Sequence, residues 1–331
     1  MKTTIIVSYD VGWGNHLAIR GGVPLSWDSG TAMDPIGAST WRLELDLDGP
    51  LEFKPCLNDE VWCFGRRDYR VEPGEVAMIH PHFLGTPGWA EAIGYIPFKG
   101  RDLSVRLYTP PGYKENAGRR YPVVYCLDGQ SLFENRDWPM EEHLNALVEA
   151  RVTEPLMVVG VDFVDRGPDM PHKKPIEAEG KAGEFATFVL KLKETVDRNY
   201  PTLSGPSHTG VLGASLGGLF ALWLGRHHPE TFGRVAAMSP SFWWDDGSML
   251  QNVQRSEGHN GQRIYLDSGT GDDEGSTPQN VKKVAAALAA EGWVEGDDLR
   301  TEFYERARPE PAEWANRIGV ALQFLFPWSG R

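Results

Sequence analysis

The chain has 331 residues, 41% of them hydrophobic and 24% charged, which is typical of a globular protein and excludes a largely disordered or fibrous one. This length exceeds one ordinary domain and favours two. The formal net charge of −13 disfavours nucleic acid or an anionic membrane as a partner, because those surfaces attract clustered lysine and arginine.

The N-terminus lacks the apolar stretch of a signal peptide, and no apolar run reaches the roughly 20 residues of a membrane span. The cysteines, Cys56, Cys63 and Cys126, are three in number. An odd number without a secretory signal indicates reduced thiols, as in a cytoplasm. We therefore expect a cytoplasmic protein, and we expect no metal or cofactor.

The first part of the chain, residues 1–90, shows the alternation of short strands. Apolar residues recur at every second position from Trp41 to Leu47, and the runs 52–57 and 61–65 are separated by the turn signal Asn58-Asp59. This pattern predicts a small all-β sandwich domain over residues 1–90.

The second part, residues 91–331, alternates apolar strands with helical patterns, which predicts an α/β domain with a mainly parallel sheet. Helices are expected over residues 138–151 and along the apolar stripe between Phe185 and Val196. The expected strands include residues 103–107, 121–127, 156–161, 209–212, 234–238 and 264–266.

The sequence Gly213-Ala214-Ser215-Leu216-Gly217 lies between an apolar strand and a helical run. Small residues on both sides of a serine allow a sharp turn from strand to helix that leaves the hydroxyl exposed above the sheet. The helix N-terminus behind the serine stabilises developing negative charge. The pattern predicts that Ser215 is a catalytic nucleophile.

Several segments together resemble the esterase family that includes esterase D, antigen 85, feruloyl esterases and enterochelin esterases. They are Tyr108-Thr109-Pro110-Pro111-Gly112-Tyr113, Leu127-Asp128-Gly129-Gln130-Ser131-Leu132-Phe133, the serine motif, and Met238-Ser239-Pro240-Ser241-Phe242-Trp243-Trp244. The resemblance is nearest to enterochelin esterase-like proteins, which cleave ester bonds in ferric siderophores. It implies an α/β-hydrolase fold and a serine esterase.

The resemblance also implies the residues around the nucleophile. Backbone N–H groups of Gln130 and Leu216 are expected to form the oxyanion hole. The acid is expected in the loop after residue 266, where Asp272 matches best, Asp273 remains an alternative and Asp267 belongs to the strand end. Trp243 and Trp244 are candidates for the wall of an aromatic substrate pocket, or for core packing.

The catalytic base is absent from its expected place. These hydrolases place a histidine after the acid in sequence, but the last histidine of this chain is His259. The segment that carries the histidine in the family, just ahead of a tryptophan, has Pro309 here, five residues before Trp314. Proline has no titratable group and cannot accept the serine proton.

Three readings follow from this gap. His172 can supply the base from the polar segment after the strand ending at Val161. His259 is a second donor, which needs an unusual acid such as Asp245 or Asp246. Otherwise the chain is a catalytically impaired pseudo-hydrolase that still binds a ligand. His208, His227 and His228 are expected to be structural.

Residues 4–75 resemble starch-binding and related carbohydrate-binding folds, with Trp27 as a candidate sugar platform. In enterochelin esterase-like proteins such a sandwich is expected to shape the substrate cleft instead. The leading hypothesis is therefore a serine esterase for a small-molecule ester, with siderophore or aryl esters favoured. The alternatives are the pseudo-hydrolase and a carbohydrate esterase.

Overall fold

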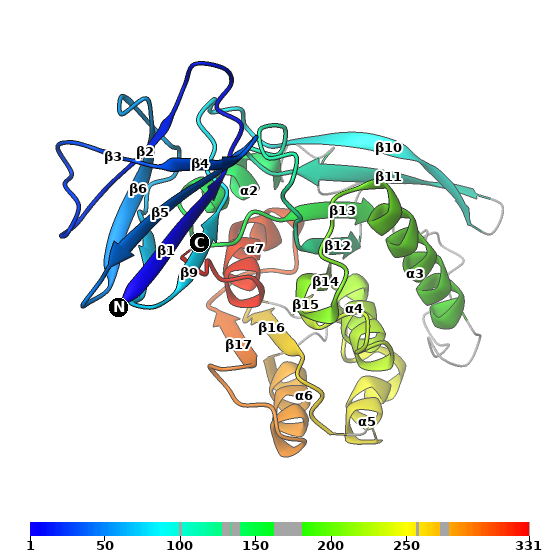
Figure 1. Cartoon of the computed structure of the whole chain (residues 1–331). Coiled ribbons are helices and arrows are strands. Elements are labelled where there is room, and N and C mark those ends of the chain that lie inside the picture. Colours follow the sequence, from blue (N-terminus) through cyan, green and yellow to red (C-terminus); the bar gives the residue numbers. More distant parts are fainter. Residues whose placement is uncertain are drawn as a thin grey trace.

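The structure, a computed structural model, describes residues 1–98, 101–127, 133, 140–161, 181–255, 258–271 and 278–330. The chain forms two packed units, a sandwich of short strands and a larger unit in which helices cover a long sheet (Figure 1). No described helix is long and apolar enough to cross a membrane.

The sandwich consists of two facing sheets. The first has the order β4-β5-β1-β9, in which β1 pairs antiparallel with β5 and parallel with β9. The second has the order β3-β2-β6-β7, and β8 pairs with β6. The strands are β1 (Lys2–Ser8), β2 (Leu17–Gly21), β3 (Thr31–Ala32), β4 (Asp34–Gly37), β5 (Thr40–Asp46), β6 (Leu51–Leu57), β7 (Val61–Trp62), β8 (Tyr69–Val71) and β9 (Val76–Ile79).

The alternating residues of both sheets meet in one core. Ile5 of β1 and Phe53 of β6 are fully buried there. Trp41 is also buried, as expected from its alternation, and its indole N–H donates to the backbone oxygen of Tyr9. Asn58 and its neighbour both have positive φ values, which are those of the tight turn that the sequence predicted between two strands.

The larger unit contains an eight-stranded sheet of order β10-β11-β13-β12-β14-β15-β16-β17. The first two strands form an antiparallel hairpin, β11 pairs antiparallel with β13, and all later pairs are parallel. The strands are β10 (Trp89–Phe98), β11 (Arg101–Thr109), β12 (Val123–Leu127), β13 (Met157–Val161), β14 (Thr209–Ala214), β15 (Arg234–Met238), β16 (Arg263–Gly269) and β17 (Leu299–Tyr304).

The helices cover both faces of this sheet. Residues of α2 and α7 share one buried cluster with one face of the strands. Residues of α3, α4, α5 and α6 share another cluster with the opposite face. The helices are α2 (Met140–Glu149), α3 (Lys181–Asn199), α4 (Leu216–His227), α5 (Ser248–Arg255), α6 (Pro278–Ala290) and α7 (Pro311–Leu325), and the short 3₁₀ turns are η1 (Pro206–His208) and η2 (Trp244–Gly247).

The sandwich contacts the amino edge of the sheet, where the parallel strands begin and the helices end. Arg151, just after α2, donates to the backbone oxygen of Phe64 at 2.8 Å. Glu115, which precedes β12, accepts from the Tyr9 hydroxyl at 3.1 Å. Trp328, which follows α7, packs on the ring of Tyr69. The described contacts of the sandwich therefore lie at the edge opposite the carboxyl ends of the strands.

The predicted strands and helices of residues 91–331 are present with small shifts of their ends. The stripe from Phe185 to Val196 is the buried side of α3. Two edge strands, β10 and β17, were not predicted. The division into domains near residue 90 stays a prediction, and in the structure β9 ends at Ile79 while β10 begins at Trp89.

Candidate active site

Ser215 lies in the sharp turn between β14 and α4, at the carboxyl edge of the sheet. Its backbone has φ 56° and ψ −122°, a conformation that costs energy in a residue other than glycine. A Cβ added at Gly213 would lie 2.3 Å from the backbone oxygen of Gly217. Glycine at 213 is therefore required for the close approach of strand and helix, as the sequence motif predicted.

The turn after β15 holds this elbow in place. The Ser215 N–H donates to the backbone oxygen of Met238 at 3.0 Å, and the Ser241 N–H donates to the backbone oxygen of Ser215 at 3.1 Å. The two hydroxyl groups, Ser215 Oγ and Ser241 Oγ, lie 3.2 Å apart. Ser241 is thus a neighbour of the nucleophile that the sequence motif did not identify.

The N-terminus of α4 faces the position above Ser215. Ser215 is the N-cap residue of this helix, and Leu216 is its first residue. The first N–H groups of a helix have no acceptor within the helix, so they are available to an oxyanion. The predicted partner of Leu216, Gln130, lies outside the described residues.

A buried ion pair lies beside the elbow. Asp267 of β16 and Arg317 of α7 approach to 3.6 Å between Oδ1 and Nη1, and both side chains are almost completely buried. Burial raises the pKa of Asp267 to about 6, although the Arg317 charge and a bond from the Ser239 N–H oppose the rise. Asp267 belongs to the strand, as the sequence predicted.

This pair holds the turn after β15. The Ser239 N–H donates to Asp267 Oδ1 at 2.8 Å, and Arg317 Nη2 donates to Ser239 Oγ at 3.1 Å. Ser239 has a φ of 39°, a second strained backbone, in the turn that contacts the nucleophile. The Tyr265 hydroxyl donates to Asp267 Oδ2 at 3.3 Å. No local sequence pattern predicts this hydrogen-bond network.

The segments that lead to the expected positions of the acid and the base contact each other. The Gly271 N–H donates to the backbone oxygen of Ala307 at 3.1 Å, and Thr270 Oγ1 accepts from the Arg306 N–H at 2.8 Å. The segment leading to Asp272 therefore packs against the segment leading to Pro309. Asp272 and Asp273 themselves lie outside the described residues.

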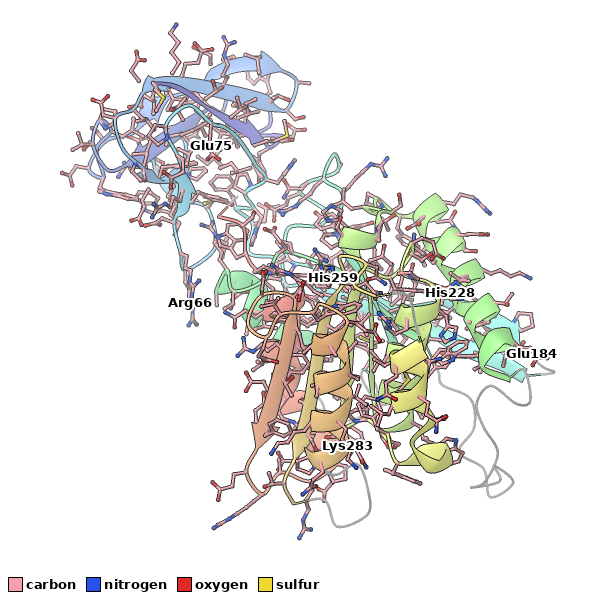
Figure 2. All side chains as sticks on the ribbon, turned by 90° about the horizontal axis from the view of Figure 1, so that it is seen from below. Arg66, Glu75, Glu184, His228, His259 and Lys283 are labelled. Carbon is pink, nitrogen blue, oxygen red and sulfur yellow. The ribbon has the colours of Figure 1, made fainter. Side chains whose placement is uncertain are left out.

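Most described histidines lie far from Ser215. His259 binds Asp298 Oδ2 at 2.6 Å, just before β16 and β17 begin. Figure 2 shows His259 on the side of the larger unit that faces the sandwich, with Lys283 of α6 on the far side. The strand β16 separates His259 from the carboxyl edge by about 20 Å.

The hypothesis that His259 is the base is therefore wrong, and the carboxylate that His259 contacts is Asp298. The side chains of Asp245 and Asp246 lie outside the described part. His208 precedes β14, and His227 and His228 end α4, so these three also lie at the amino edge.

His16 belongs to the sandwich, and His80 and His82 lie in the segment after β9, so two histidines remain for the base. His172 lies outside the described residues. His143 lies in the first helical turn of α2, which begins at the carboxyl edge, and one turn later Leu147 contacts Gly319 of α7. Sequence reasoning did not consider His143, because no motif surrounds it within the helix expected over residues 138–151.

The two tryptophans after Ser241 have different surroundings. Trp243 is exposed over 42% of its surface, whereas Trp244 is buried with 7% exposed. Their rings lie 5.8 Å apart. Trp243 is thus available to a ligand, and Trp244 packs in the core beneath it.

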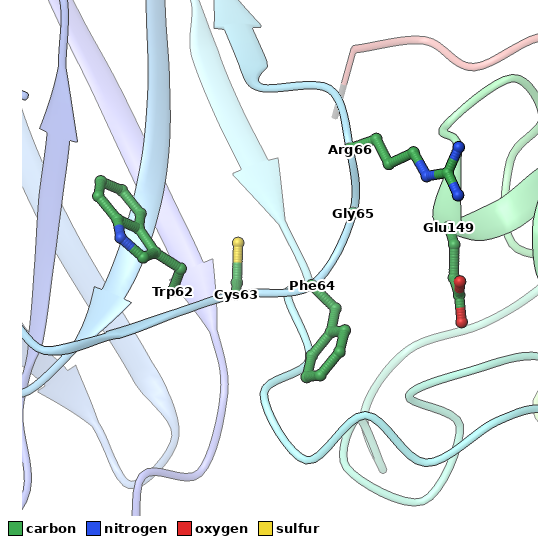
Figure 3. Close-up of a pocket in the computed structure, with 6 residues that line it drawn as sticks. All are labelled: Trp62, Cys63, Phe64, Gly65, Arg66 and Glu149. Atoms are coloured by element: carbon green, nitrogen blue, oxygen red, sulfur yellow. The ribbon is translucent and has the colours of Figure 1, made fainter.

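A separate cavity of about 300 Å³ lies between the sandwich and the end of α2. Figure 3 shows Trp62 and Phe64 of the sandwich with Arg66 and Glu149 around it. Because Glu149 ends α2, this cavity is at the amino edge and is distinct from the position of Ser215. Among the described residues, the sandwich thus shapes this cavity rather than the surroundings of the nucleophile.

The strand order, the elbow and the helices on both faces define an α/β-hydrolase with a serine nucleophile position, which confirms the predicted fold class. Residues 98–315 match the family described as "Putative esterase". The chain belongs to this family of esterases.

The chain is also similar in sequence to individual proteins. The chain is 25% identical over 239 residues to the uncharacterized protein YbbA of Bacillus subtilis, covering 66% of this chain and 91% of that protein. It is 30% identical over 155 residues to the iron(III) enterobactin esterase of Escherichia coli O6:H1, covering 45% of this chain. The match spans 37% of that esterase, so it does not extend over the whole relative.

Solved structures share the fold. The enterobactin esterase FES of Shigella flexneri has a TM-score of 0.57 at 19% identity, and the match covers 94% of this chain and 88% of that one. A ferulic acid esterase has a TM-score of 0.58 at 14% identity, over 73% of this chain and 99% of that one. The first match includes the sandwich as well as the larger unit, because it covers nearly the whole chain.

Proposed function

We propose that this chain hydrolyses a small-molecule carboxylic ester, an aryl or siderophore ester, with Ser215 as the nucleophile. The observation that carries the proposal is the strained backbone of Ser215 at the N-terminus of α4, on the carboxyl edge of the sheet. The enterobactin esterases among the relatives support a siderophore ester, and the ferulic acid esterase fold supports an aryl ester.

The geometry suits a two-step acyl transfer. Ser215 Oγ attacks the ester carbonyl, and the tetrahedral oxyanion is stabilised by the Leu216 N–H and the N-terminus of α4, with Gln130 as the proposed second donor. The serine proton passes to a base, and the alcohol or phenol leaves as the acyl-enzyme forms. Water then attacks the acyl-enzyme and releases the acid.

The replacement of the expected histidine by Pro309 affects which class of ester the chain is expected to hydrolyse. An aryl ester releases a phenol, whose pKa of about 10 makes it a far better leaving group than an alkoxide. Such a substrate depends less on proton donation to the leaving group. We propose His172 as the base, with Asp272 as its acid, and we propose His143 as the second candidate base.

The test combines hydrolysis of p-nitrophenyl butyrate with covalent labelling by a fluorophosphonate. The Ser215→Ala variant should lose both reactions, and either His172→Ala or His143→Ala should lower turnover by about 10²-fold or more. His208→Ala, at the amino edge, is the matched control and should behave as the wild type.

Labelling that survives in Ser215→Ala refutes the nucleophile. A wild type that binds an aryl or siderophore ester tightly but never hydrolyses it refutes the hydrolase and makes the chain a binding protein.

A further inference from the structure

The contact between Ser215 and Ser241 is the starting point. Their hydroxyl oxygens lie 3.2 Å apart, and either can donate. Ser241 is 3% exposed, so its hydroxyl has little access to competing water. A nucleophilic hydroxyl rotates freely about one bond unless a neighbour fixes it. Ser241 is a neighbour able to do so from a second element.

Ser241 is itself held firmly. Its N–H donates to the backbone oxygen of Ser215, and its own backbone oxygen accepts from the Trp244 N–H at 3.0 Å. The turn that carries it begins at Ser239, whose φ of 39° is unfavourable for serine. Such a conformation persists only where surrounding interactions over-determine it.

The Asp267–Arg317 pair supplies these interactions. The Ser239 N–H has two acceptors in the same residue, Asp267 Oδ1 at 2.8 Å and the backbone oxygen at 3.1 Å. Arg317 Nη2 donates to Ser239 Oγ, while Arg317 Nε donates to the backbone oxygen of Glu313, which anchors the guanidinium to α7. A buried ion pair often adds little to the stability of the fold. We therefore assign the Asp267–Arg317 pair the role of holding Ser239 in place.

We propose that Ser241 is a positioning residue that fixes the hydroxyl of Ser215, and that the buried Asp267–Arg317 pair fixes Ser241 through the strained turn at Ser239. The proposal rests on the proposed function, because it takes Ser215 as the nucleophile. It adds a contact from the β15 turn that neither the elbow motif nor the expected acid and base supply.

The groups that face Asp267 come from each element packed around it. Arg317 approaches from α7, Ser239 from the turn after β15, and Tyr265 from the same strand. Tyr304 of β17 bonds the Tyr265 hydroxyl at 3.1 Å, and Glu302 is the strand partner of Asp267. Arg317 is the cation among these groups, so it is the residue whose change most directly disturbs the turn.

The experiment uses the full chain with Ser215→Cys and needs no ester hydrolysis. The natural cysteines are buried and free, so iodoacetamide should alkylate position 215 alone, as checked by mass spectrometry. The pH dependence of the alkylation rate gives the pKa of this thiol. A hydroxyl that donates to the thiolate lowers that pKa.

Adding Ser241→Ala should raise the alkylation midpoint by about one pH unit. Adding Arg317→Lys should raise it by less, because the charge stays while the donor to Ser239 is lost. The control is Thr209→Val, which removes a buried hydroxyl that donates to Gly205 at the other end of β14. It should leave the midpoint unchanged.

An unchanged midpoint in the Ser241→Ala background overturns the role of Ser241. An unchanged midpoint with Arg317→Lys overturns the role of the ion pair. A wild-type chain that is inert toward esters refutes the proposed function instead, and the thiol midpoint still decides whether the contact exists.

Discussion

The buried carboxyl of Asp267 predicts an unusual dependence of stability on pH. Its pKa rises from the ordinary 3.8 to about 6, with burial as the main cause. Because the folded state then holds the proton more tightly than the unfolded state, this group stabilises the fold below pH 4. That contribution is lost as the pH rises through about 6.

The magnitude follows from the size of the rise in pKa. One pKa unit corresponds to about 1.4 kcal/mol, so ionising Asp267 in the folded protein costs about 3 kcal/mol relative to the unfolded chain. Other carboxylates also titrate in this range. The informative quantity is therefore the difference in the free energy of unfolding between the wild type and Asp267→Asn, which stays neutral at every pH.

Urea unfolding followed by tryptophan fluorescence between pH 4 and pH 7.5 measures this difference. The wild type should lose about 2.5 kcal/mol relative to Asp267→Asn as the pH rises across that range, because part of the full effect is already lost at pH 4. The variant Asp297→Asn, which removes a carboxylate from an exposed turn, is the control for the loss of charge alone. A difference that is constant, or that grows in favour of the wild type as the pH rises, would refute the reasoning.

Three further predictions concern the elbow, the missing base and the contact between the two units. In the His172→Ala background, which lacks the proposed base, adding Pro309→His should raise p-nitrophenyl ester turnover by about 10²-fold or more; Pro309→Ala in the same background controls for the lost proline, and no gain over it would contradict the assignment of that position. Gly213→Ala should cost about 1–3 kcal/mol and abolish fluorophosphonate labelling, because its Cβ would meet the Gly217 carbonyl. Full labelling of that variant would show that the elbow does not need glycine. Arg151→Met should cost about 2 kcal/mol or more, because Arg151 is buried, bonds the backbone of the sandwich and lies over the Tyr69 ring. It should speed proteolysis between residues 63 and 67 without changing turnover, whereas an equal loss of turnover would mean that the two edges are coupled.

The parts of the fold that the sequence predicted are those with a clear apolar pattern over a few consecutive turns or strand residues. The strand that leads to Ser215 contains a short apolar run between two glycines, and α3 carries an unbroken apolar stripe. The strand β17 was missed because Arg300 and Glu302 interrupt it with charge, and it lies half exposed at the sheet edge.

The site was predicted only where its chemistry is contiguous. Ser215 and its glycines occupy five successive residues, whereas Asp267 and Arg317 are 50 positions apart and meet only through the packing of α7 on β16. The separation of Trp243 from Trp244 by burial likewise depends on the 3₁₀ turn η2, which no periodicity signals.

The attachment of the sandwich at the amino edge of the sheet has an evolutionary consequence. Its contacts involve Arg151, Glu115 and Trp328, which lie where helices end or before strands begin. Insertions after the carboxyl ends of the strands, where substrates of such folds bind, leave these contacts intact. The substrate range and the contact between the two units can thus diverge independently. Gene fusions that exchange the segments after the carboxyl ends of the strands should leave the sandwich attached.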